Sequence, residues 1–255
     1  MALLNSSNPV LSEKRFRDTI LDDVVTHENA MTVKGTLQKF GFLLLMVLAT
    51  SFYSWREFFA QSGSVMPLIL IGGIGGFVIA MVISFKKEWS AYLTPAYALL
   101  EGLFIGAISA YYSAAFAAKA PNIVINAVGL TLGTAIAMYL LYSFRIIQAT
   151  QKFKAIMFTA IAGIFIFYLI TFVLGFFGIQ IPFLHEGSVL GIGFSLFVVA
   201  IAALTFILNF DMIEKGAELG APKYMEWYGA FGLLVTIVWL YLEILRLLSK
   251  LNSRN

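Results

Sequence analysis

Cysteine is absent from the 255-residue sequence, and histidine occurs only twice. The lack of cysteine excludes a disulfide framework, a CxxC redox or zinc motif and a thiol nucleophile. His27 and His185 lie far apart and form no HExxH pair, so we expect no histidine-based metal centre. Charged residues are also scarce, because they make up 12% of the chain, against about 25% in soluble domains.

Apolar residues dominate what is present. They make up 60% of the sequence, and the mean hydropathy is +0.88. An ordinary soluble fold could not bury so much apolar surface. Backbone groups in lipid must pair within their own segment, so helices are expected throughout. The composition therefore predicts an all-α polytopic membrane protein in contact with the lipid bilayer. The net charge of +3 is small, and no nucleic-acid partner is expected.

Seven apolar stretches are long enough to cross a membrane, whose hydrocarbon core requires about 20 helical residues. We expect residues 39–251 to form one seven-transmembrane-helix bundle. The predicted spans are 40–59, 65–85, 91–117, 123–144, 153–177, 188–210 and one within 227–251.

A polar segment, residues 1–38, precedes the first span. A signal peptide would place its apolar region much nearer the start, so we expect a retained cytosolic tail. Lysine and arginine are frequent on the side of this tail, whereas the opposite loops hold only Arg56 and Lys119. This asymmetry predicts a cytosolic N-terminus by the positive-inside rule. The C-terminal Arg246, Lys250 and Arg254 do not fit the rule, because seven spans place them on the other side.

Glycine pairs at a spacing of four recur in the predicted spans. Small residues at this spacing let two helix backbones approach closely, so we interpret them as packing faces. The stretch GGIGGF at 72–77 lies inside a span, follows no strand and lacks the lysine of a P-loop, so nucleotide binding is not expected. The pairs are Gly72 with Gly76, Gly102 with Gly106, Gly129 with Gly133, and Gly187 with Gly191.

Four acidic residues stand in or beside the apolar runs, namely Glu101, Asp211, Glu226 and Glu243. An ionised side chain at the centre of a bilayer costs about 2.5–3.5 kcal/mol on insertion scales, so each one requires an explanation. Glu101 could be a protonated side chain bonded to a neighbouring helix, and Glu226 could lie at a headgroup interface. Glu243 and Arg246 are three residues apart and could form a local ion pair that lowers the insertion cost.

Asp211 gives Glu243 a second interpretation. Asp211 closes the sixth span, Glu214 follows one turn later, and the next turn would bring the last span back antiparallel. Two carboxylates that face each other in a low dielectric cannot both stay ionised at low cost, so one would keep a proton near neutrality. Such a pair is a proton sensor and a hard oxygen site for Ca²⁺. Acid would then favour the hydrogen-bonded pair and weaken Ca²⁺ binding.

The depth of Glu243 decides whether this pair can form. If the last helix began at Pro222, Glu243 would lie about 30 Å along it and nearly across the bilayer from Asp211. Gly229 and Gly232 interrupt the stretch YMEWYGAFG, whose aromatic residues suit a membrane interface. A break at these glycines would start the final span near position 231. We expect this arrangement, which makes Asp211 and Glu243 neighbours near the middle of the membrane.

These motifs resemble those of the transmembrane Bax inhibitor motif family, in particular its bacterial branch. The resemblance rests on seven spans after a cytosolic tail, on ILNFDMIEKG at the end of the sixth span and on LYLEILRLL in the last. YALLEGLFIGAIS in the third span is also similar, and the likeness covers residues 35–251. The resemblance implies six helices around a central seventh, and a pH-sensitive Ca²⁺ leak gated by an aspartate pair on the sixth and seventh helices. It also implies a protein of the bacterial inner membrane.

The same resemblance assigns two acids. The acid of the seventh helix corresponds to Glu243, and that of the sixth corresponds to either Asn209 or Asp211. These two positions lie about 200° apart on a helix and cannot both face the centre. If Asn209 is the match, no proton-sharing pair exists. Glu214 and Glu226 are further candidates for the site.

Two functions remain open. The first is a Ca²⁺ leak or proton-coupled exchange, in which Asp211 and Glu243 sense protons and ligate the metal, with Arg246 and Glu101 as charge partners. The second is a non-transporting scaffold that binds membrane proteases or other membrane proteins. An intramembrane enzyme is not expected, because the sequence offers no GxSxG elbow and no Ser/His/Asp set. No cofactor is expected beyond transported or bound Ca²⁺.

Overall fold

The structure is a computed structural model that describes residues 30–60, 65–178 and 187–253. Within these ranges, seven helices are long and apolar enough to cross a membrane, as the sequence predicts. Most of the predicted tail, His27 and His185 lie outside the described residues. A 3-10 turn, η2 (Lys87–Trp89), joins the second and third spans. The spans are α2 (Val33–Phe59), α3 (Val65–Phe85), α4 (Ser90–Ala115), α5 (Ile123–Ser143), α6 (Gln151–Phe176), α7 (Val189–Glu218) and α8 (Met225–Ser253).

Several helices continue past the apolar runs into polar sequence. The Thr32 hydroxyl accepts a hydrogen bond from the Gly35 amide, so a side-chain cap starts α2 well before the apolar run. Thr150 caps α6 in the same way. At its C-terminal end, α7 also continues beyond the predicted span, from Phe210 to Glu218. The apolar pattern therefore locates each span, and capping and polar turns decide where each helix ends.

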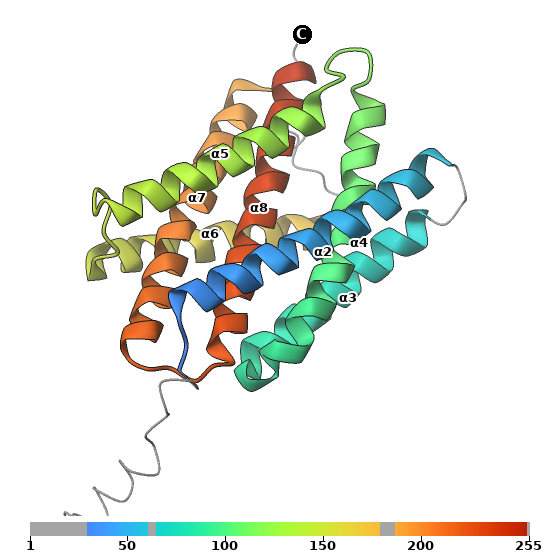
Figure 1. The fold of residues 1–255 in the computed structure, drawn as a ribbon. Helices are drawn as coiled ribbons and strands as arrows, with labels where there is room; N and C mark the ends of the chain where they lie inside the picture. The colour runs from blue at the N-terminus through green and yellow to red at the C-terminus, as the bar shows by residue number, and fades with distance from the viewer. Residues whose placement is uncertain (1–29, 61–64, 179–186, 254–255) are drawn as a thin grey trace, which may run out of the picture.

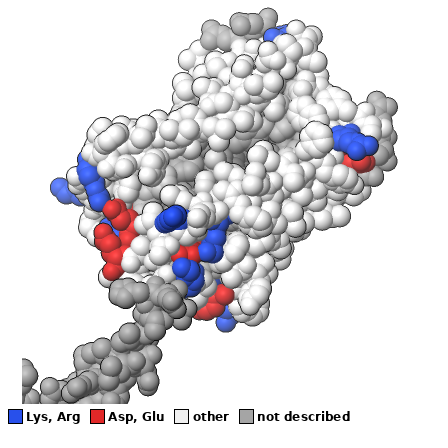
Figure 2. Space-filling view, in the orientation of Figure 1, with Lys and Arg blue, Asp and Glu red and all other residues white. Residues whose placement is uncertain are grey.

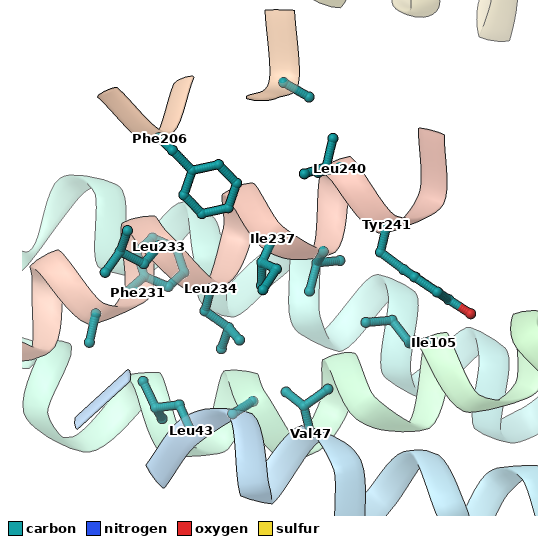
Figure 3. Close-up of a cluster of buried hydrophobic side chains, with 14 of the residues drawn as sticks. Leu43, Val47, Ile105, Phe206, Phe231, Leu233, Leu234, Ile237, Leu240 and Tyr241 are labelled. Carbon is teal, nitrogen blue, oxygen red and sulfur yellow. The ribbon is translucent and has the colours of Figure 1, made fainter. Parts of the chain in front are cut away.

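The last helix, α8, passes through the middle of the bundle (Figure 1). A larger share of it is buried than of any other described span, and α2, α4, α5 and α7 all pack against it. Leu234 and Ile237 of α8 face Leu43 and Val47 of α2, and Phe206 of α7 lies on the opposite side of α8 (Figure 3). The expected central position of the last helix is confirmed.

Two of the predicted glycine pairs form close helix contacts. The pair on α3 lies against α4, and the pair on α4 lies against α2. A Cβ atom on Gly106 would lie 2.6 Å from the Ser51 Cα atom of α2, and one on Gly72 of α3 would lie 2.6 Å from the Leu100 carbonyl oxygen. These glycines let α2 and α3 lie directly against α4. By contrast, a Cβ atom on Gly129 or Gly133 of α5 would have no neighbouring atom within 4 Å in the described part of the chain.

α8 is continuous, so the predicted break at Gly229 and Gly232 is wrong. A Cβ atom on Gly229 would lie 3.0 Å from Ile213 Cγ1 of α7 and 3.0 Å from Thr36 Cγ2 of α2. The glycine therefore permits a close approach of three helices and does not end one of them. A glycine in a helix interior costs about 1 kcal/mol, and the packing of α8 against its neighbours outweighs that cost.

We call the end of the bundle where α2, α4, α6 and α8 begin the basic end, and the opposite end the far end. At the basic end, the fully buried Glu226 accepts hydrogen bonds from the Thr32 amide at 2.9 Å and the Thr32 hydroxyl at 2.8 Å. Lys39 and Lys223 both form ion pairs with the Glu226 carboxylate. This cluster fastens the start of α2 to the start of α8.

A second ion pair at the basic end fastens the α5–α6 connection to α7. Arg145 Nη2 lies 2.6 Å from Glu214 Oε1, and the Tyr142 hydroxyl donates to the same carboxylate. The Glu214 carboxylate raises the pKa of the Arg145 guanidinium above its ordinary value. Figure 2 shows charged side chains of both signs gathered at this end, beside a broad uncharged surface. Such a surface fits contact with lipid tails.

Candidate functional site

A row of polar side chains follows the contact between α7 and α8. Asn209 Nδ2 of α7 donates to Thr236 Oγ1 of α8 at 2.7 Å and to the Gly232 carbonyl oxygen at 3.2 Å. Fourteen residues away on each helix, Lys250 Nζ donates to Ser195 Oγ at 2.8 Å. The helices are antiparallel, and both contacts are equally far along the chain from the turn that joins them. They therefore fix one register for the whole contact.

This register places Ala202 opposite Glu243, halfway between the two polar contacts. Residues seven apart lie on the same face of a helix, because seven residues make about two turns. The three levels are thus about 10 Å apart, and together they cover about 20 Å of a hydrocarbon core about 30 Å thick. We call these three levels the polar seam: Asn209–Thr236, Ala202–Glu243 and Ser195–Lys250.

The middle level holds an ion pair whose carboxylate is buried and whose guanidinium is partly exposed. Glu243 is 2% exposed, and Arg246 Nη1 donates to its two carboxylate oxygens at 2.8 Å and 3.0 Å. The Tyr168 hydroxyl of α6 donates to Glu243 Oε1 at 3.1 Å and accepts from Arg246 Nη1 at 2.6 Å. Tyr112 of α4 and Lys250 of α8 are close enough to interact electrostatically with this cluster. The predicted local pair of Glu243 with Arg246 is therefore confirmed, with a tyrosine closing the triangle.

The far level of the seam holds a buried lysine. Lys250 is 3% exposed, and besides Ser195 its ammonium donates to the Gly191 carbonyl oxygen at 3.0 Å. Within the described ranges, no carboxylate forms an ion pair with it. Gly191 is buried beneath it, at the start of α7. The Lys250 ammonium is therefore hydrogen-bonded to neutral oxygen atoms, which could also coordinate a free cation.

Asp211 does not face Glu243. Its carboxylate pairs with Lys154 of α6 and with Lys215, whose Nζ lies 2.7 Å from Asp211 Oδ1. Asp211 and the position opposite Glu243 are nine residues apart on α7, or about 13 Å along the helix axis. The predicted proton-sharing or Ca²⁺-binding pair is therefore not formed. The correction follows from the continuity of α8, which carries Glu243 too far from the basic end.

The register question between the two candidate positions on α7 is also answered. Asn209 faces α8, and Asp211 lies on another side of α7, toward α6. Glu101, the other predicted charge partner, hydrogen-bonds with Tyr97 and lies against Gly76 of α3, away from the seam. Glu214 and Glu226 serve the basic end, as described above. Across the described residues, no group of three or more His, Cys, Asp and Glu side chains lies together.

Several residues of the site were not predicted from the sequence. Ser195 and Lys250 could have been found, because polar residues recur every seven positions on α8 and stand fourteen positions apart on α7, at equal distances from the turn. Tyr168 and Lys154 carry no such signal, since they belong to α6 and meet α7 and α8 only through the tertiary arrangement.

A protein-family model described as Bax inhibitor 1 like matches residues 8–253, nearly the whole chain. The chain belongs to the Bax inhibitor 1-like family. Membership confirms the resemblance that the span pattern and the motifs of the last two helices indicated. Together with the seven apolar helices, it makes this chain an integral membrane protein in contact with the lipid bilayer. A search of curated proteins finds no match.

Proposed function

We propose that the protein is a pH-sensitive cation leak that passes Ca²⁺, and that the polar seam is its pathway. The observation that carries the proposal is the position of Glu243, a buried carboxylate on the central helix of a membrane-spanning bundle. Ionisable residues within the membrane are costly and mark ion or proton pathways. The seam supplies further oxygen atoms on both sides of this carboxylate, toward the basic end and toward the far end, at intervals of about 10 Å.

The protein's own cations occupy the acceptor atoms of the pathway. Arg246 holds Glu243, and Lys250 holds the oxygen atoms of Ser195 and Gly191. Two lysines hold Asp211 near the basic end. A cation that passes along the seam would have to displace Lys250 and Arg246 in turn. The arrangement corresponds to a closed state in which tethered cations block the seam.

Opening requires a helix that can move, and α6 is the span with the smallest buried share among those described. One apolar cluster around Met157 and Ile164 packs it on α7. Among the described residues, its polar side-chain contacts with other helices include those of Lys154 with Asp211 and of Tyr168 with the middle level of the seam. Loss of these contacts would release α6 and widen the seam.

Acid opens the pathway in this proposal. Uptake of a proton by Glu243 would remove the negative charge that holds Arg246. The contact with Arg246 is present while the Glu243 carboxylate is ionised and is lost when the carboxylate takes up a proton. This direction is opposite to the one predicted for a carboxylate pair, because Glu243 faces a guanidinium, a tyrosine and, more distantly, Lys250.

Ca²⁺ is the cargo in this proposal, with no resident site. Ca²⁺ takes six to eight oxygen ligands, and the seam offers a few at each level. Weak binding at several levels suits passage, because an ion that binds tightly does not leave.

Purified protein in sealed phospholipid vesicles with a Ca²⁺ indicator inside provides the test. We expect a Ca²⁺ influx above that of protein-free vesicles, rising as the external and internal pH are lowered together from about 8 to about 5. An influx no greater than that of protein-free vesicles at every pH would overturn the proposal. It would leave the alternative function, a scaffold for membrane proteases or other membrane proteins.

A further inference from the structure

A cavity of about 480 Å³ opens on the side of the bundle away from the ion pair of the seam. Its walls come from α2 and α5, and its floor comes from α4 and α8. Tyr241, on the floor, lies two residues before Glu243 and therefore about 200° around α8 from it. The lining residues used below are Leu44, Leu48, Phe52 and Trp55 of α2, Val128 and Leu132 of α5, and Ile105, Ser109 and Tyr241 of the floor.

The cavity is continuous with the surface that contacts the lipid. Leu48 and Phe52 on one rim are 61% and 72% exposed, and Leu132 on the other rim is 45% exposed. All four helices that form the cavity are membrane spans. Lipid tails therefore surround its mouth, and the floor residues lie buried behind it.

The cavity offers mainly hydrocarbon surface, and the hydroxyl groups in its lining are hydrogen-bonded within the protein. The Ser109 hydroxyl is bonded to the Ile105 carbonyl oxygen and to the Tyr241 hydroxyl, both at 2.6 Å. The other hydroxyls in the lining are satisfied in the same way, because Ser51 donates to the Gly102 carbonyl oxygen and Thr131 to that of Ala127. A water molecule requires two to four polar partners, so water is a poor occupant here. An acyl chain forms no hydrogen bonds, so it loses none when it enters the cavity.

The length of the cavity fits one leaflet. Leu44 and Trp55 of the lining are eleven residue steps apart on α2, or about 16 Å, and half of a hydrocarbon core is about 15 Å. Trp55 stands near the end of α2, where aromatic side chains suit the membrane–water interface. The volume is that of a small-molecule site, which ranges over about 300–1,000 Å³.

We propose that this cavity binds one acyl chain of a phospholipid from the leaflet at the far end. The chain enters between α2 and α5 and lies against Ile105, Ser109 and Tyr241. Its headgroup stays at the interface beside Trp55. The site is separate from the seam, and it places a lipid directly against the central helix.

The test is photolabelling in vesicles made of a phosphatidylcholine that carries a diazirine in the middle of one acyl chain, followed by mapping of the labelled residues by mass spectrometry. We expect label on the floor residues Ile105, Ser109 and Tyr241 as well as on the rim. Label confined to rim residues such as Phe52 would overturn the proposal, because it would show ordinary lipid contact at the surface. An unlabelled rim and floor would also overturn it and would indicate that a second copy of the chain covers the cavity.

A matched pair of variants on α5 separates occupancy from folding. Val128 lines the cavity, and Leu130, two residues on, is exposed but does not line it. Val128→Trp should fill the mouth and reduce floor labelling severalfold, whereas Leu130→Trp should leave it unchanged. Equal floor labelling in both variants would contradict entry by this route.

Discussion

Asn209 Nδ2 of α7 lies 2.7 Å from the Thr236 hydroxyl oxygen of α8, and this contact decides which side of α7 faces the central helix. Asp211, two residues on, consequently lies on another side, where Lys154 and Lys215 neutralise it. The same register puts Ala202, a residue with no polar side-chain atom, opposite Glu243. At the contact between α7 and α8, a carboxylate with a guanidinium therefore stands where a pair of carboxylates was expected.

Ala202→Asp should build the missing pair. The new carboxylate would face Glu243 in a low dielectric, so the two could share a proton or bind a cation together. We expect the acid response of the Ca²⁺ leak to weaken or reverse, because acid would then favour a hydrogen-bonded pair. Ala202→Asn, of equal size, is the control and should keep the wild-type direction. The measurement is vesicle Ca²⁺ flux against pH, and the same profile for both variants would contradict the assigned register.

Lys250→Met should raise the leak several-fold at neutral pH. The substitution keeps a long side chain and removes the tethered ammonium from the Gly191 and Ser195 oxygen atoms. Lys119→Met is the matched control, since Lys119 is exposed in the connection between α4 and α5. Initial rates of Ca²⁺ entry at equal protein density are compared. A rate for Lys250→Met no higher than that of the control would show that Lys250 does not block the path.

Gly106→Ala should destabilise the fold by about 1–3 kcal/mol, as overpacking of a filled contact does. The added methyl group would collide with the backbone of α2 around Ser51. Gly129→Ala is the control, because a Cβ atom there meets nothing within 4 Å. Thermal unfolding in detergent measures both. The melting temperature should fall by several degrees for Gly106→Ala and stay within error for Gly129→Ala, and equal melting temperatures would contradict the α2–α4 contact.

The seven spans were predictable because lipid imposes a simple rule on composition, whereas the central position of the last helix was implied by the family resemblance. A run of about 20 apolar residues has few alternatives to a spanning helix. The close contacts of Gly72 and Gly106 were predictable for a related reason, since small residues are a requirement of close helix packing. The local pair of Glu243 and Arg246 followed from helix geometry alone.

The partners of Asp211 and the continuity of α8 were not predictable in the same way. Gly229 reads equally well as a helix break or as a close contact, and only the presence of Ile213 and Thr36 beside it decides for the contact. A break would have moved Glu243 toward Asp211, so one error in a glycine's role produced the error in the site. Tyr168 belongs to a third helix, and nothing in its own sequence surroundings indicates that it meets Glu243.

Glu243→Gln tests the central claim most directly. Glutamine keeps the size of the side chain, but it removes the charge that holds Arg246 and replaces one of the two oxygen atoms that accept from Arg246 with an amide group that donates. Glu101→Gln is the matched control, because Glu101 also contacts a tyrosine inside the bundle but lies between α3 and α4. Vesicle Ca²⁺ flux is measured from about pH 8 to about pH 5 for both. We predict a raised, pH-insensitive leak for Glu243→Gln and a wild-type acid response for Glu101→Gln, and an unchanged acid response in Glu243→Gln would contradict the account.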